Sequence, residues 1–276
     1  MSDEARTVLV TGANSGIGLA TVVELARRGF RAVGSVRSEA KAAAVREAAS
    51  AAGVDVETVL LDVNDAEACK EVVPGLGPWG LVNNAGYAVT GAVEDVEDEE
   101  AEALFQTMVH APMRLARLAL PSMRAAGGGR IVNVSSIAGR VTAPFAGHYT
   151  AAKHALEALT DALRIEVAGA GVRVVLVEPG GFRTGIWEEF ERDIARRERE
   201  GSRYVGAYRR YLQAQRLAEP LMGDPQTCAR VIAGALTTRL PRSRYLVGLD
   251  AQAANLADSL TPTIVKDRFY RLTLGL

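Results

Sequence analysis

The sequence predicts a single α/β domain built on a Rossmann-type doubly wound parallel β-sheet, with helices on both faces and a helical insertion over the substrate site. Two observations predict this class. Short apolar runs alternate with helical patterns through the first two thirds of the chain. These runs are almost continuous in Val, Leu and Ile, which is typical of parallel strands covered on both faces. Strands separated by helices of this length imply right-handed crossovers.

The strands and helices are assigned from these patterns in chain order. Six strands are expected first, at residues 7–11, 32–36, 58–62, 81–83, 130–135 and 172–178. Helices are expected at residues 16–28, 39–52, 65–73, 98–125 and 149–168. A further helix near residues 226–236 and a short strand near 245–247 would complete the sheet.

The chain is expected to form one domain over residues 1–276, because no linker, repeat or charge block marks a boundary. Its 48% hydrophobic content is sufficient for a full core. The pattern changes at residues 185–224, which are rich in Arg and Glu. The apolar residues there recur at the spacing of amphipathic helices, and we interpret the segment as a substrate lid. Its two stripes are Trp187, Phe190 and Ile194, then Tyr204, Tyr208, Tyr211 and Leu212.

Charge and composition exclude several classes of partner. A net charge of −1 argues against nucleic acid or an anionic membrane as the main partner. No apolar run approaches membrane-spanning length, and the polar start at residues 1–6 lacks signal-peptide character. Cys69 and Cys228 are expected to be buried free thiols, which favours a cytoplasmic protein. The three histidines show no ligand pattern, so no metal site is expected.

A glycine-rich turn follows the first predicted strand and opens the first helix. Glycines let a backbone turn sharply and approach a pyrophosphate, whose charge then meets the free N–H groups of the helix. At the first strand–helix junction this pattern predicts dinucleotide binding, although the glycines alone would also suit a tight turn and close helix packing. The turn reads Thr11-Gly12-Ala13-Asn14-Ser15-Gly16-Ile17-Gly18.

The end of the second predicted strand indicates which dinucleotide binds. An acidic residue there would hold the ribose 2′-hydroxyl, whereas an arginine accommodates a 2′-phosphate. The chain has no acid at this point and carries Arg37, with the hydroxyl of Ser15 in plausible reach. NADP(H) is therefore favoured over NAD(H).

Tyr149 and Lys153 are four residues apart and would share one face of a helix. A fixed ammonium beside a phenol favours phenolate, so the pair is expected to lower the pKa of Tyr149 from about 10. Ser136, thirteen residues upstream of the tyrosine, adds a hydroxyl that could hold a carbonyl or alcohol oxygen in line with the phenol. This combination suits proton transfer coupled to hydride transfer.

Together these motifs resemble the short-chain dehydrogenase/reductase family in its single-domain branch, nearest to the 17β-hydroxysteroid and retinol dehydrogenase-like members. The resemblance is close over residues 7–184. It assigns Ser136, Tyr149 and Lys153 as the catalytic residues. It also matches the glycine turn, the adenine-holding pair, the fourth-strand motif and the turn beside the nicotinamide; the last three are Asp62-Val63, Asn83-Asn84-Ala85-Gly86 and Pro179-Gly180-Gly181-Phe182-Arg183-Thr184.

The resemblance implies an oxidoreductase that transfers hydride between NADP(H) and a carbonyl or alcohol. Tyr149 would be the acid–base residue, Lys153 would bind the nicotinamide ribose, and Ser136 would hold the substrate oxygen. Candidate substrate contacts are His148, Trp187, Tyr204 and Tyr208. The aromatic residues suggest a bulky hydrophobic substrate, steroid-, retinoid- or polyketide-like.

One position departs from the family pattern. Met108 stands where the family has an asparagine that supports a water linking the catalytic lysine to solvent. Pro112 lies four residues later and has no N–H for the carbonyl of Met108, so the helix should bend there. We hypothesise that this carbonyl keeps the water in place without asparagine, which counts Met108 among the catalytic positions.

Two other functions and an assembly remain open from the sequence. A catalytically weak NADP(H)-binding sensor or scaffold is the main alternative, supported by Met108 alone. A sugar-nucleotide epimerase or dehydratase would use the same tyrosine and lysine. The family commonly pairs its two long helices across a dyad, so a homodimer or homotetramer is expected, here through residues 98–125 and 149–168.

Overall fold

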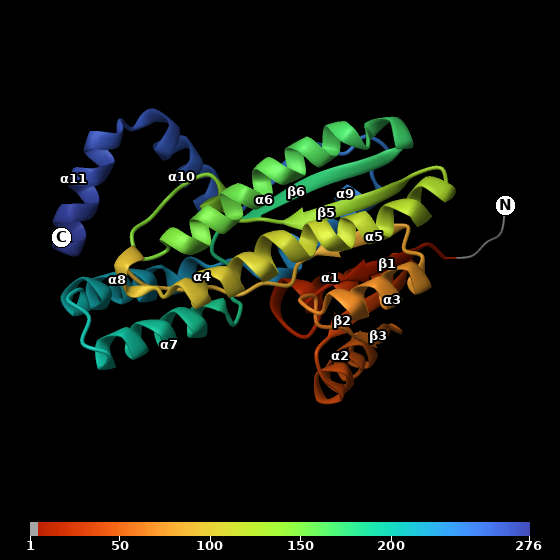
Figure 1. Ribbon diagram of the computed structural model, residues 1–276, viewed down its shortest axis with the longest axis horizontal. Helices are drawn as coiled ribbons and strands as arrows, with labels where there is room; N and C mark the ends of the chain where they lie inside the picture. The colour runs from red at the N-terminus through yellow and green to blue at the C-terminus, as the bar shows by residue number, and fades with distance from the viewer. Residues whose placement is uncertain (1–4) are drawn as a thin grey trace.

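The computed structural model describes residues 5–276, so most of the polar N-terminal segment considered above lies outside the description. Seven parallel strands form one sheet in the order β3-β2-β1-β4-β5-β6-β7. Figure 1 shows the sheet with helices packed around it. This confirms the predicted doubly wound sheet. The strands are β1 (Thr7–Val10), β2 (Arg31–Val36), β3 (Glu57–Leu60), β4 (Gly80–Asn83), β5 (Gly129–Val134), β6 (Val172–Pro179) and β7 (Arg244–Val247).

The strand order reverses direction between β1 and β4. On either side of this point, successive crossovers run away from each other and leave a crevice at the carboxyl ends of the strands. The glycine turn after β1 and the motif after β4 both open into this crevice. The topology alone therefore places the predicted nucleotide-binding residues together.

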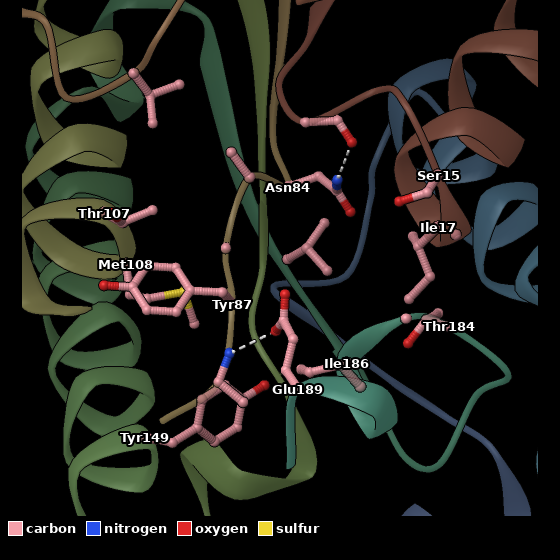
Figure 2. Close-up of a pocket in the computed structure, with 18 of the residues that line it drawn as sticks. Ser15, Ile17, Asn84, Tyr87, Thr107, Met108, Tyr149, Thr184, Ile186 and Glu189 are labelled. Carbon is pink, nitrogen blue, oxygen red and sulfur yellow. Dashed lines mark hydrogen bonds between the residues drawn. The ribbon is translucent and has the colours of Figure 1, made fainter. Parts of the chain in front are cut away.

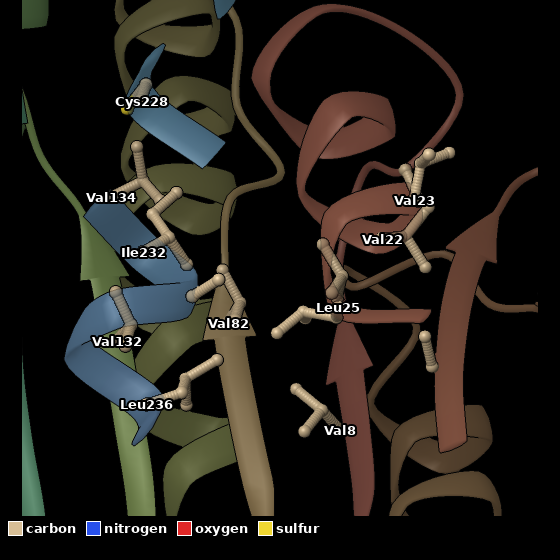
Figure 3. Packing of buried hydrophobic residues seen from close by; sticks show 14 of the residues in the cluster. Val8, Val22, Val23, Leu25, Val82, Val132, Val134, Cys228, Ile232 and Leu236 are labelled. Atoms are coloured by element: carbon tan, nitrogen blue, oxygen red, sulfur yellow. The ribbon is translucent and has the colours of Figure 1, made fainter. Parts of the chain in front are cut away.

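Helices cover both faces of the sheet, and each layer buries an apolar cluster. On one face, Val22 and Leu25 of α1 and Ile232 and Leu236 of α9 pack against strand residues such as Val82 (Figure 3). The second face is covered by α3, α5 and α6. The bounds are α1 (Gly16–Arg27), α2 (Glu39–Ala51), α3 (Ala66–Leu76), α5 (Ala111–Ala125), α6 (Gly147–Glu166) and α9 (Pro225–Thr237).

The single long helix expected at residues 98–125 is interrupted. It consists of α4 (Asp98–Phe105), a π-helical turn (Gln106–His110) and α5. Pro112 lies two residues after the π-helical turn, and because proline offers no N–H the regular hydrogen-bond ladder cannot run through it. The predicted bend is thus realised as a π-bulge, a feature often found at functional sites.

The insertion forms two helices, α7 (Ile186–Arg199) and α8 (Val205–Ala218), as its stripes predict. Beyond β7 lie two helices that the sequence patterns did not predict, α10 (Leu249–Leu260) and α11 (Thr263–Leu274). They arch away from the sheet, and α11 returns to α8 through the buried Leu274 (Figure 1).

The sequence also predicted free cysteines and the absence of a membrane-spanning segment. Cys69 and Cys228 are both buried and free. No helix within residues 5–276 combines the length and the apolar character needed to cross a lipid bilayer.

Candidate active site

A pocket of about 1180 Å³ opens at the carboxyl ends of β1, β2, β4, β5 and β6 (Figure 2). That volume suits a dinucleotide together with a small ligand. Most of the residues predicted from the sequence line it. They are Gly12, Asn14, Ser15, Gly16, Ile17, Arg37, Asp62, Val63, Asn84, Ala85, Gly86, Met108, Ser136, Tyr149, Lys153, Pro179, Gly180, Phe182, Thr184 and Trp187.

The glycine turn is shaped by close backbone approaches. Gly12 has a positive φ of 64°, and a Cβ there would lie 2.8 Å from the Cα of Ala85. A Cβ on Gly18 would lie 2.3 Å from the carbonyl oxygen of Gly12. Gly18 is not among the residues that line the pocket, and its lack of a side chain lets α1 pack against the turn. Its contact with a cofactor stays a prediction.

The motif after β4 is tied to this turn by hydrogen bonds. The side-chain amide of Asn84 donates to the carbonyl oxygens of Thr11 (3.0 Å) and Gly12 (3.2 Å). In return, the Thr11 hydroxyl oxygen accepts from the backbone amides of Asn84 and Ala85, each at 3.0 Å. Asn84 therefore fixes the shape of the turn as well as lining the pocket.

The far end of the pocket, after β2, carries positive charge. Arg37 lines it as predicted, and so does Lys41 in the first turn of α2. Sequence reasoning predicted a helix starting at residue 39 but did not identify Lys41, because the packing of α2 on the sheet decides which side of the helix faces the pocket. Asp62 and Val63 line the pocket beside this charge.

Ser136, Tyr149 and Lys153 converge from two elements. Ser136 follows β5, and its hydroxyl donates to the carbonyl oxygen of Pro179 at 3.5 Å and accepts from the Ala138 amide at 3.1 Å. Tyr149 and Lys153 lie on one face of α6 and are 8% and 7% exposed. The Lys153 ammonium donates to the carbonyl oxygen of Val134 at 2.9 Å.

Burial dominates the ionisation of this pair. It raises the pKa of Tyr149 to about 12, although the Ser136 hydroxyl opposes the shift as a hydrogen-bonding partner and the charge of Glu189 adds to it. Burial also lowers the pKa of Lys153 to about 8, opposed by the charge of Glu157. This corrects the expectation that the lysine pulls the phenol pKa down. The ammonium is directed at Val134 and lies 5.7 Å from the Tyr149 ring centroid.

Met108 fills the space beside the motif after β4. It is 3% exposed and belongs to the same apolar cluster as Tyr149. A Cβ on Gly86 would lie 2.5 Å from the Met108 sulfur, so the two positions fit closely (Figure 2). The π-helical turn therefore delivers an apolar side chain to the place that the family resemblance assigns to asparagine.

A network of charged residues, with Glu157 and Glu178 buried, connects α6 to the edge of the sheet. The Nε and Nη2 atoms of Arg140 donate to the two carboxylate oxygens of Glu178 in β6, at 2.7 and 3.0 Å. Arg244 of β7 contacts Glu178 and Glu157, each at 3.2 Å. Burial raises the pKa of Glu157, while the Ser135 hydroxyl lowers it. Ser135 is buried beside this network.

The first lid helix, α7, is held over the pocket by carboxylates. Glu189 accepts a hydrogen bond from the Ala88 amide (3.1 Å), and Asp193, one turn later, accepts from the Thr90 amide (2.9 Å). Both acceptors bind the segment that follows β4. Sequence reasoning missed Glu189 and Asp193 because their partners are about a hundred positions away in the chain.

Three predicted substrate contacts lie outside the pocket, which corrects their assignment. Tyr208 is fully buried beside Phe145 and hydrogen-bonds Asp95, while Tyr204 hydrogen-bonds Glu94. His148 is also absent from the pocket wall. The second lid stripe faces its own cluster with α11, whereas the first brings Trp187 to the pocket, its indole N–H donating to the Phe182 carbonyl at 2.8 Å.

The described residues offer no ligand set for a metal ion. Within residues 5–276 no group of three or more His, Cys, Asp or Glu side chains is arranged to hold a metal ion.

Comparison with known proteins identifies the family. A family model described as short chain dehydrogenase matches residues 6–195. The chain belongs to the short-chain dehydrogenase/reductase family. It is 34% identical to retinol dehydrogenase 16 of Mus musculus, over 94% of this chain and 86% of that protein.

Solved structures of the family share the whole architecture. A short-chain dehydrogenase from Streptomyces avermitilis is 32% identical, with a TM-score of 0.79 and 99% of each chain covered. A metagenomic short-chain oxidoreductase in complex with NADP is 28% identical, with a TM-score of 0.70, covering 90% of this chain and 99% of that one. These matches show an oxidoreductase family whose members bind a nicotinamide cofactor.

Proposed function

We propose that this protein is an NADP(H)-dependent ketoreductase or alcohol dehydrogenase that transfers hydride between the nicotinamide and a carbonyl or alcohol of a bulky, largely apolar substrate. The observation that supports this most is the convergence of Ser136, Tyr149 and Lys153 in one pocket with the glycine turn. We propose this activity because the chain belongs to an oxidoreductase family and its own residues form the site.

The pocket wall fits a dinucleotide. The tight approach at Gly12 leaves no room for a side chain, which would let the backbone come close to a pyrophosphate. Helix α1 begins at Gly16, and the N-cap Ser15 makes no side-chain capping hydrogen bond, so the first amides are not capped from within the chain. Arg37 and Lys41 would hold a 2′-phosphate at the other end.

Within this site each catalytic side chain has one task. Bound NADPH supplies the hydride. Tyr149, with its pKa raised to about 12, is protonated near neutral pH and can donate a proton to a carbonyl oxygen. Ser136 would donate a hydrogen bond to the same oxygen as negative charge develops on it. Lys153 would bind the nicotinamide ribose.

The substrate end of the pocket has an apolar wall formed by Met108, Val89, Ile186 and Trp187. Its composition favours a bulky hydrophobic substrate. Retinol dehydrogenase 16 is named for a substrate of this kind, which supports the same class here without selecting among steroid-, retinoid- and polyketide-like compounds.

Assembly and location complete the proposal. On α6, Leu159 and Ile165 are 42% and 70% exposed, which suits a contact with a second copy and hence a homodimer or homotetramer. The free, buried Cys69 and Cys228 suit a reducing compartment such as the cytoplasm. Light scattering of the purified protein tests the first point.

The activity is tested with purified protein, a panel of bulky ketones, and NADPH or NADH as reductant. The proposal expects at least one ketone to be reduced, with higher kcat/KM for NADPH than for NADH. The Tyr149→Phe variant should bind NADPH but lose about 10²- to 10⁴-fold in rate, the typical contribution of general acid catalysis. Cofactor binding without reduction of any ketone would instead favour the sensor or scaffold alternative.

A further inference from the structure

Glu189 is an acidic side chain that lines the pocket together with the apolar residues Met108 and Ile186. Its carboxylate and the Tyr149 phenol point into the same cavity in Figure 2, near Ile186 and Met108. The residue is half-buried, at the start of the lid helix α7. A carboxylate here influences both the catalytic phenol and any ligand that reaches it.

The other half-buried acids of the pocket wall are already paired with arginines, whereas Asp62, Glu99 and Glu188 are exposed to solvent. Glu100 forms ion pairs with Arg196 and Arg197, and Asp193 pairs with Arg196 as well as accepting from Thr90. Within residues 5–276 Glu189 takes part in no ion pair, and its one hydrogen bond comes from the Ala88 amide. A carboxylate offers about four acceptor positions, so most of its capacity is unused by the chain.

The ionisation of Glu189 depends on its burial and on the charges around it. Burial raises its pKa, while the Ala88 amide and the charges of Arg192 and Arg37 lower it and Asp193 raises it. The negative charge of Glu189 in turn raises the pKa of Tyr149. Because both side chains face the same cavity in Figure 2, a substrate held at the phenol would also lie close to the carboxylate.

A bulky ligand without a hydrogen-bond donor would displace water from this carboxylate without replacing the hydrogen bonds that the water made. Such desolvation is unfavourable, whereas a ligand hydroxyl or amino group would replace the lost water with a charge-assisted hydrogen bond. Sites built to hydrogen-bond a substrate group discriminate strongly against analogues that lack it.

We infer that Glu189 is a specificity-determining residue, which selects carbonyl substrates carrying a hydroxyl or amino donor a few bonds from the reacting carbonyl. This inference rests on the proposed function and narrows its substrate class. The Ala88 amide holds the carboxylate in place, and the lid helix carries it over the substrate.

The test uses matched ligands: a bulky hydroxyketone, its deoxy analogue and its methyl ether. Their dissociation constants are measured with the NADP-loaded protein by quenching of tryptophan fluorescence, since Trp187 lines the pocket. The wild type should bind the hydroxyketone about 10- to 100-fold more tightly than either analogue, as expected for a hydrogen bond to a charged group. Glu189→Gln, which keeps an acceptor for Ala88, should bind all three alike.

A second readout separates recognition from simple packing. Because the charge of Glu189 raises the Tyr149 pKa, Glu189→Gln should shift the basic limb of the pH–rate profile to lower pH. Glu191→Gln, on the outer face of the same helix and paired with Arg216, is the matched control and should change neither readout.

Three results would overturn the inference. They are equal binding of the three ligands by the wild type, an unchanged preference in Glu189→Gln, and a loss of NADP affinity in Glu189→Gln without a change in ligand preference. If the ligands bind selectively and none is reduced with NADPH, the proposed oxidoreductase activity fails while the assignment of Glu189 stands.

Discussion

Replacing Arg37 with alanine should weaken the binding of NADPH but not that of NADH. Arg37 lines the pocket at the end of β2, where the sequence of residues 34–38 has no acidic residue that would bind a ribose hydroxyl. A guanidinium binds phosphate through two N–H groups, and a hydrogen bond to a charged group contributes about 1.5–3 kcal/mol. NADH lacks the 2′-phosphate, so it would lose nothing when Arg37 is removed.

The magnitude follows from the exposure of Arg37. Its side chain is exposed, so solvent competes for it and the lower part of that range applies. A loss of about 1.5–2 kcal/mol corresponds to an increase of about 10- to 30-fold in the Kd for NADPH. Lys41 remains in the variant, which keeps some phosphate affinity.

The assay is equilibrium titration of both cofactors at two salt concentrations, following the fluorescence of the reduced nicotinamide. Arg46→Ala is the matched control, because it removes a cation from α2 whose side chain binds Thr58 away from the pocket. The difference between wild type and Arg37→Ala should shrink at high salt. An equal rise in the Kd for NADPH and NADH, or no change in either, would refute the role assigned to Arg37.

The remaining predictions concern the turn, the buried network and the π-helical turn. Gly18→Ala would place a Cβ 2.3 Å from the Gly12 oxygen, so calorimetry should show a lower Tm and titration a weaker affinity for both cofactors; an unchanged Tm would contradict the packing argument. Burial raises the pKa of Glu157, so its contribution to stability is complete below its unfolded pKa and is lost as pH rises through the folded value. The unfolding free energy of the wild type should therefore fall relative to Glu157→Gln as pH rises above about 4.5, and denaturant titrations with parallel pH dependence would reject this. Pro112→Ala restores an N–H that lets the regular helix close, so it should slow turnover more than Met108→Asn does, and steady-state rates of equal or opposite order would reject that role for the proline.

The sheet and the nucleotide end of the pocket were predictable because their signals are local. Continuous apolar runs specified six of the parallel strands to within about two residues, and the glycine turn lies directly after β1. Pro112 predicted a distorted helix, although only the structure shows that the distortion is a π-helical turn. In each of these cases the residues that determine the local structure lie close to it in the sequence.

The substrate end was less predictable because its geometry is set by distant contacts. An amphipathic stripe shows that a helix buries one face, but not which cluster it joins; Tyr204 and Tyr208 pack toward α11 and Phe145 instead of the pocket. Glu189 is one of many acids in its segment, and only the Ala88 amide, 101 residues away, distinguishes it. The pKa of Tyr149 was predicted in the wrong direction because burial cannot be read from the spacing of two residues.

The most direct test of the account follows the hydride and the proton together in a single turnover. NADPH carrying deuterium at the transferable position is mixed with excess protein and a ketone that binds, and the product alcohol is analysed by mass spectrometry. We expect deuterium on the carbinol carbon with the wild type, and at least a hundredfold slower appearance of that product with Tyr149→Phe at unchanged NADPH affinity. Equal rates of deuterium transfer in the two proteins, or a product without the label, would contradict the assignment of Tyr149 as the proton donor in a hydride-transfer reaction.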